Sequence, residues 1–150
     1  MKQRELPSDP MEDSDRLMEE LLPMAKLLLE RYGEFFPMGA EIGFDGDLQQ
    51  VPAPEGIDQT NTMAAAELLR QAFAARAELG ELRVSAVIQD LMLIEEGAER
   101  RADAISIEIE HFTGYNVTMI VRYKRIDGRI AFEAPFVGDG VHRIFPPHRA

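Results

Sequence analysis

The chain of 150 residues contains no cysteine. It can therefore form no disulfide framework, no thiolate metal site and no cysteine nucleophile. It also lacks a run of 18 or more apolar residues, so we expect no transmembrane helix. Its first fifteen residues, MKQRELPSDPMEDSD, show no apolar core like that of a secretory signal. These absences fit a protein of the reducing cytoplasm.

Motifs that bind cofactors or support catalysis are missing as well. The sequence has no Walker loop, no G-x-G-x-x-G and no G-x-S-x-G. Its three histidines do not fall at H-x₃-H or H-E-x-x-H spacing. Asp45-Gly46-Asp47 lacks the remaining ligands of a calcium-binding loop. We therefore expect no cofactor and no metal.

Basic residues are scarce, and the formal net charge is −11. Nucleic acid is therefore not an expected partner, because lysine and arginine drive phosphate binding. The segment from Glu34 to Thr60 carries six acidic residues and no lysine or arginine, whereas the chain from Arg101 onward is nearly balanced. A basic protein partner would be expected to bind the acidic middle.

The most regular pattern lies in Ala104–Glu133. Isoleucines at 105, 107 and 109 alternate with Ser106, Glu108 and Glu110, which is typical of a strand with one buried face. A three-residue loop, 112–114, would pair Ile109 with Val117 and keep both strands buried on the same side. The Asp127-Gly128 turn predicts a second hairpin, in which Tyr123 faces Phe132 and Arg122 faces Glu133.

The N-terminal half predicts a helix that begins at Asp9 or at Ser14. Its apolar stripe runs from Met18 to Tyr32 across Pro23, so we expect one kinked helix, which Gly33 ends. A hairpin follows at 38–51. Its register is open because Ile42 can face either Leu48 or Gln50.

The middle of the chain predicts a loop at 52–61, a helix at 62–79 and a strand at 82–94. The expected core side of this helix holds Leu68, Ala72, Ala75 and Leu79, with Leu69 and Phe73 nearby. The apolar end of the strand, Leu91–Ile94, indicates burial on both faces or a bulge near Asp90. A last short edge strand is expected at about 141–145.

This order predicts an α+β fold, α-β-β-α-β-β-β(-β), with an antiparallel sheet of five to six strands and both helices on one face. We expect a single domain over 1–150, with 1–8 frayed and 52–61 an internal loop. The order resembles that of profilin-like and roadblock-like domains, which is an analogy of topology.

Three short motifs carry a more local resemblance. RYGEFFPMGA near residue 35, EIEHFTGY near residue 110 and the closing APFVGDG resemble a group of small uncharacterised bacterial α+β proteins with a YGEF…PxGA, ExEH…GY and PF pattern. The resemblance spans most of 21–145. It implies a fold and supplies no catalytic residue.

Candidate site residues fall into three groups. Glu108, Glu110 and Arg122 share the polar face of the central strands, which favours a solvated or partner-facing surface over an acid catalyst, because carboxylates beside cations stay ionised. His111 and Tyr115 face one another at a hairpin end, where a proton transfer is conceivable but a packing pair is commoner. Phe35 and Phe36 form either a core junction or an interface.

Three possibilities for the function remain. The first is a non-catalytic, acidic interaction domain. It self-associates through a sheet edge or the outer face of the sheet, for example as a homodimer, or it binds another protein, for example by immunity-type masking of a basic protein. The alternative is a small-ligand binder or enzyme that uses His111, Tyr115 and Glu110. A third possibility is a subunit of a larger assembly whose exposed edge strand is completed by another chain.

Overall fold

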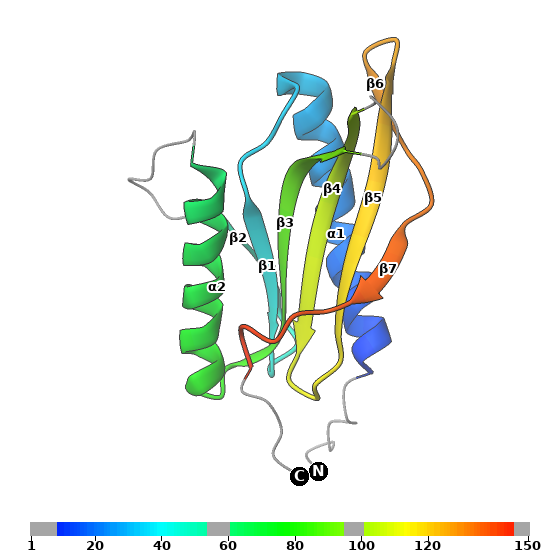
Figure 1. Ribbon diagram of the computed structural model, residues 1–150. Helices are drawn as coiled ribbons and strands as arrows, with labels where there is room; N and C mark the ends of the chain where they lie inside the picture. Colours follow the sequence, from blue (N-terminus) through cyan, green and yellow to red (C-terminus); the bar gives the residue numbers. More distant parts are fainter. Residues whose placement is uncertain (1–8, 54–60, 95–100, 146–150) are drawn as a thin grey trace.

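A computed structural model describes residues 9–53, 61–94 and 101–145. The expectations for residues 1–8 and for most of the 52–61 loop lie outside these ranges. The described chain has an α+β fold, as predicted, with two helices and one antiparallel sheet (Figure 1). The elements are α1 (Pro10–Tyr32), β1 (Met38–Gly43), β2 (Leu48–Val51), α2 (Thr62–Glu78), β3 (Leu82–Ile94), β4 (Arg101–His111), β5 (Asn116–Ile126), β6 (Arg129–Phe132) and β7 (Phe136–Asp139).

The sheet has seven strands in the described residues, one more than the upper end of the prediction. Their order is β2-β1-β3-β4-β5-β6, and β7 pairs with the other half of the outer edge of β5. The last strand lies at Phe136–Asp139, so the edge strand expected at 141–145 is wrong. The amides of Arg143 and Ile144 bind a glutamate side chain instead of a neighbouring strand.

Both predicted hairpin registers of the central strands are confirmed. Ile109 pairs with Val117, and Tyr123 pairs with Phe132. Gly114, with φ of 95°, takes the left-handed conformation that the three-residue loop requires. The open register of the first hairpin resolves with Ile42 opposite Leu48. Neither alternative for the apolar end of β3 is found in the described residues: the pairing with β4 runs past Asp90 without a bulge, and Met92 is exposed. The register of β3 shifts instead against Ile42 and Gly43 of β1.

The two helices cover opposite faces of the sheet, so the expectation that both lie on one face is wrong. In Figure 1, α1 runs behind the strands and α2 lies along their other side. Ile105, Ile107 and Ile109 are fully buried together with α1 residues, whereas Glu108, on the alternate face, binds Arg70 of α2. The polar side of the sheet still offers apolar surface at Leu82 and Val87, which α2 buries.

Of the two predicted starts of helix α1, Asp9 and Ser14, the structure has Asp9, and the helix ends at Gly33 as predicted. Asp9 accepts a hydrogen bond from the amide of Met11, and Gly33 closes the helix in the left-handed conformation. The helix continues across Pro23. Leu17, Leu21, Ala25 and Leu29 form its buried stripe, which places α1 on β1, β3, β4 and β5.

The buried side of helix α2 is rotated from the predicted stripe toward Leu69 and Phe73, which were expected beside it. Its buried residues are Ala65, Ala66, Leu69, Arg70 and Phe73, whereas Leu68 and Leu79 are exposed. A Cβ on Gly39 of β1 would lie 2.8 Å from Cζ of Phe73. The helix is therefore oriented by the close approach of Phe73 to a glycine and by the ion pair of Arg70, neither of which follows from the apolar spacing.

Candidate functional site

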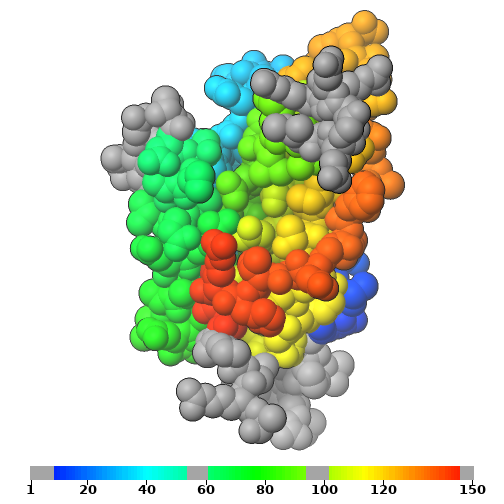
Figure 2. Space-filling model, viewed as in Figure 1, coloured from blue at the N-terminus to red at the C-terminus, as the bar shows by residue number. Residues whose placement is uncertain are grey.

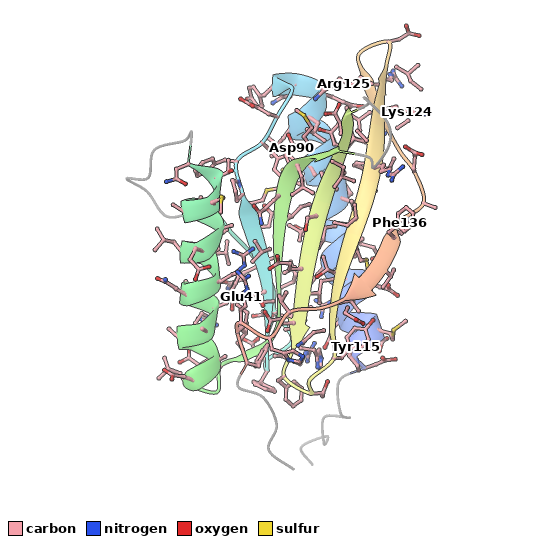
Figure 3. All side chains as sticks on the ribbon, viewed as in Figure 1. Glu41, Asp90, Tyr115, Lys124, Arg125 and Phe136 are labelled. Atoms are coloured by element: carbon pink, nitrogen blue, oxygen red, sulfur yellow. The ribbon has the colours of Figure 1, made fainter. Side chains whose placement is uncertain are left out.

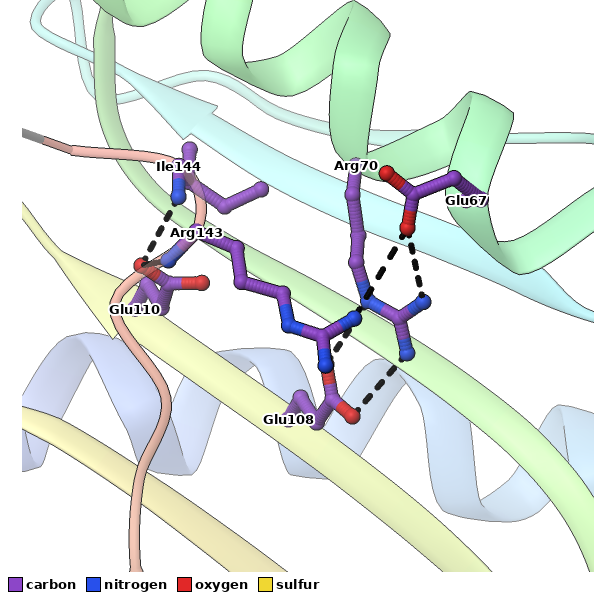
Figure 4. Close-up of polar contacts among 6 residues, drawn as sticks. All are labelled: Glu67, Arg70, Glu108, Glu110, Arg143 and Ile144. Carbon is purple, nitrogen blue, oxygen red and sulfur yellow. Dashed lines mark hydrogen bonds and ion pairs between the residues drawn. The ribbon is translucent and has the colours of Figure 1, made fainter.

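Glu108 and Glu110 lie on the face of the sheet that α2 covers, and residues from distant parts of the chain bind their carboxylates (Figure 4). Arg70 of α2 binds Glu108 with two hydrogen bonds of 3.0 Å, from Nε to Oε1 and from the second guanidinium nitrogen to Oε2. Both side chains are mostly buried. This bidentate geometry satisfies Glu108 internally and ties α2 to the centre of the sheet.

Glu110 anchors the segment that follows β7. Its Oε1 atom accepts hydrogen bonds of 3.0 Å from the backbone amides of Arg143 and Ile144. The side chain of Ile144 packs between α2 and the sheet, beside Phe73 and Val87. Figure 2 shows this red segment crossing the sheet face toward α2. Burial raises the pKa of Glu110, although the backbone hydrogen bonds oppose the rise.

His111 lies on the other face of β4, fully buried against the start of α1. The amide of Thr113 donates to its Nδ1, so Nδ1 is the acceptor and Nε2 carries the proton. Nε2 lies 2.9 Å from Oδ2 of Asp13, whose Oδ1 binds Arg83 at 2.9 Å. Burial lowers the pKa of His111, while Asp13 raises it and Arg83 lowers it further.

The predicted convergence of His111, Tyr115 and Glu110 at one hairpin end is not found. The amide of His111 donates to the carbonyl of Tyr115, so the two residues face one another as expected. Their side chains, however, point elsewhere: the Tyr115 hydroxyl donates to Sδ of Met11 at 3.3 Å, and Glu110 lies on the opposite sheet face. Figure 3 shows Tyr115 at the edge of the molecule, beside the first turn of α1.

The remaining predicted site residues, Arg122, Phe35 and Phe36, do not form one site. The guanidinium carbon of Arg122 lies 5.6 Å from the ring centre of Phe136, a cation–π distance, on the far side of the sheet from α1. Phe35 is buried and Phe36 is half-buried. Both line a pocket of about 650 Å³. The other described residues of its lining are Leu28, Tyr32, Glu34, Pro37, Met38, Pro52, Ala53 and Thr62.

The acidic residues of the first hairpin form a second pocket, of about 370 Å³, which we call the acidic end. It is lined by Glu41, Gly43, Phe44, Asp45, Asp47, Gln49, Arg76 and Glu81. Four of these residues carry carboxylates and one carries a guanidinium. Arg76 binds the buried carboxylate of Glu41 at 2.7 Å and that of Glu81 at 3.5 Å. Figure 3 shows Glu41 between β1 and α2.

Several residues of these clusters were not foreseen. Asp13 and Arg70 lie on helices whose buried sides are predicted from apolar spacing alone. Both are buried although they are charged. A charged residue at a core position is the signal that could have found them, because such a residue needs a partner. The register shift at the start of β3 gave no signal in the sequence.

In the described ranges no group of three or more acidic or histidine residues has a geometry suited to a metal. No helix among these residues is long and apolar enough to cross a membrane. Comparisons with protein families, with curated proteins and with solved structures found no match to this chain.

Proposed function

We propose that the protein is a non-catalytic, cytoplasmic interaction domain whose acidic end binds a basic protein partner, in the manner of an immunity-type inhibitor. The observation that supports this most is the pocket between β1, β2 and α2, where Asp45, Asp47 and Glu81 hold exposed carboxylates. A lysine or arginine side chain of the partner fits the charge of this pocket.

The nearby cations are already engaged. Arg76 is bound to Glu41 and Glu81, and the guanidinium of Arg16 donates to the carbonyl of Gly46 at 3.2 Å. The exposed carboxylates of Asp45 and Asp47 are therefore available to a partner, except that Oδ1 of Asp45 accepts from the amide of Asp47. Charge pairs of this kind chiefly set association rate and specificity, and salt weakens them.

The proposal is tested by affinity purification from the native cell with mass spectrometry. The test variant carries Asp45→Asn, Asp47→Asn and Glu81→Gln. The matched control carries Glu19→Gln, Asp127→Asn and Glu133→Gln, which removes the same charge from exposed residues elsewhere. A basic protein is expected with wild type and control and is lost with the test variant. Equal recovery with all three proteins would overturn the proposal.

A second candidate function is binding of a small apolar molecule in the pocket of Phe35 and Phe36. Its volume lies in the range of ordinary ligand sites, and its lining is mostly apolar. This pocket supports the ligand-binding alternative better than the His111–Tyr115 hairpin end, where the side chains diverge. The test measures the melting temperature with a panel of aromatic and aliphatic compounds, for the wild type and for Phe36→Ala. If a compound raises the melting temperature of both proteins equally, it does not bind in this pocket.

A further inference from the structure

The outer edge of β7 is an unusual surface for an acidic protein. All four of its residues are exposed, and within the described residues the strand pairs only with β5. Phe136 is 63% and Val137 is 61% exposed. Of the exposed large hydrophobic residues in the described ranges, these two alone are neighbours in sequence. β7 forms the margin of the sheet in Figure 1, and Figure 3 shows Phe136 there.

The other edge strands carry or adjoin polar and charged residues. The side chain of Gln50 in β2 is bound to Glu20, and the acidic turn of residues 45–47 precedes this strand. β6 begins with Arg129, directly after the Asp127-Gly128 turn. Residues 134–138, in contrast, read Ala-Pro-Phe-Val-Gly without a charge. An uncharged apolar edge leaves backbone groups ready to pair with another strand.

We propose that β7 pairs antiparallel with β7 of a second copy, about a two-fold axis at Val137, so that two sheets become one. In such a pair, residues directly opposite one another point to the same face of the sheet. The possible registers of the two β7 strands therefore differ by steps of two residues. With Val137 opposite Val137 of the second copy, Phe136 faces Gly138 of that copy. The glycine leaves room for the ring, a pairing known to stabilise glycine in sheets.

The strand is self-complementary in this register, with Phe136 of each copy opposite Gly138 of the other, and the register also keeps like charges apart. Asp139 falls opposite Pro135 of the other chain, so the two aspartates lie at opposite ends of the paired strands. Two chains of net charge −11 repel one another, and an uncharged strand is where they can approach most closely. The inference goes beyond the proposed function, because the acidic end lies at the β1–β2 hairpin and β7 lies at the other edge of the sheet.

A single cysteine tests the register directly, since the natural chain has none. In an antiparallel pair the opposed Cα atoms lie about 4.5–5.5 Å apart, within the reach of a disulfide. Val137→Cys is therefore expected to form a disulfide-linked dimer in an oxidising glutathione buffer. Ile126→Cys, exposed to 56% on β5, is the control and is expected to stay monomeric under the same conditions. Equal cross-linking of both variants, or of neither, would overturn the proposal.

Sedimentation equilibrium supplies the second measurement. A four-residue strand buries little area, so the dimer is expected to be weak, with a dissociation constant on the order of 10–100 µM. Val137→Lys should raise that constant at least ~10-fold, while Ile126→Lys should leave it unchanged. Added salt should strengthen this dimer, whereas it should weaken binding of a basic partner at the acidic end. A monomer at all concentrations and salt levels would refute the dimer and leave the proposed function standing.

Discussion

Nε2 of His111 lies 2.9 Å from Oδ2 of Asp13, a residue 98 positions earlier in the chain. This contact joins the first turn of α1 to the hairpin between β4 and β5. Arg83, at the start of β3, completes the cluster by binding the other oxygen of Asp13. Three segments that are far apart in sequence are therefore fixed to one another by a buried carboxylate.

Replacing His111 with alanine is expected to destabilise the fold by about 3 kcal/mol, because it opens a cavity and removes a hydrogen bond from the buried Asp13. Urea unfolding followed by circular dichroism measures the change in the free energy of unfolding. Asp15→Ala is the control: Asp15 is exposed on the same helix and should change that free energy by less than about 0.5 kcal/mol. A His111→Ala protein as stable as the control would show that the cluster contributes nothing.

The pH dependence of stability should carry the signature of His111. Burial lowers its pKa below the ordinary 6.5, so the unfolded chain takes up the proton first as pH falls. The contribution of His111 is thus complete above pH 6.5 and is lost as pH falls from there toward the folded-state pKa. Glu110 acts in the opposite sense at lower pH, because burial raises its pKa above 4.5 and the folded state takes up that proton first.

The measurement is the free energy of unfolding of wild type and His111→Gln across this window. The carboxylates titrate in both proteins, so the difference between the two curves isolates the histidine. The wild type is expected to lose stability relative to the variant as pH falls below 6.5. A constant difference would mean that the proton affinity of His111 does not change on folding.

The sequence allowed the hairpins to be predicted because their information is local. The alternation of Ile105, Ile107 and Ile109, together with the Asp127-Gly128 turn, determines both registers without reference to the rest of the chain. The prediction that both helices lie on one face of the sheet was wrong because a local strand pattern does not show which distant segments cover each face. Ser106 and Glu110 look like solvated positions, yet both are buried, and the C-terminal segment binds Glu110.

The candidate site was harder to predict because its partners are distant. Glu108 and Glu110 were identified from one strand, but their partners lie 38 and 33–34 residues away. A strand pattern shows which carboxylates share a face and not what covers that face. To predict which segment covers that face, one would need to know how α2 is rotated about its axis. That rotation depends on the contact between Phe73 and Gly39.

Glu110→Gln is expected to loosen the segment that follows β7. A neutral amide is a weaker acceptor than a carboxylate for the two amides of Arg143 and Ile144. Hydrogen exchange by NMR should show both amides exchanging about 10-fold faster, a local loss of about 1.4 kcal/mol. Glu108→Gln is the control, since it weakens the Arg70 pair and leaves these amides in place. Unchanged exchange in Glu110→Gln would remove its anchoring role.

Gly140 provides the sharpest steric prediction. A Cβ at this position would lie 2.4 Å from the carbonyl carbon of Asn116 and 2.6 Å from the amide nitrogen of Val117. Because backbone cannot move aside cheaply, Gly140→Ala should displace the C-terminal segment and cost about 1–3 kcal/mol. Gly138→Ala is the matched control, with its nearest neighbour 3.9 Å away. Denaturant unfolding at concentrations below self-association compares the two, and equal stability would show that residue 140 is not pressed against β5.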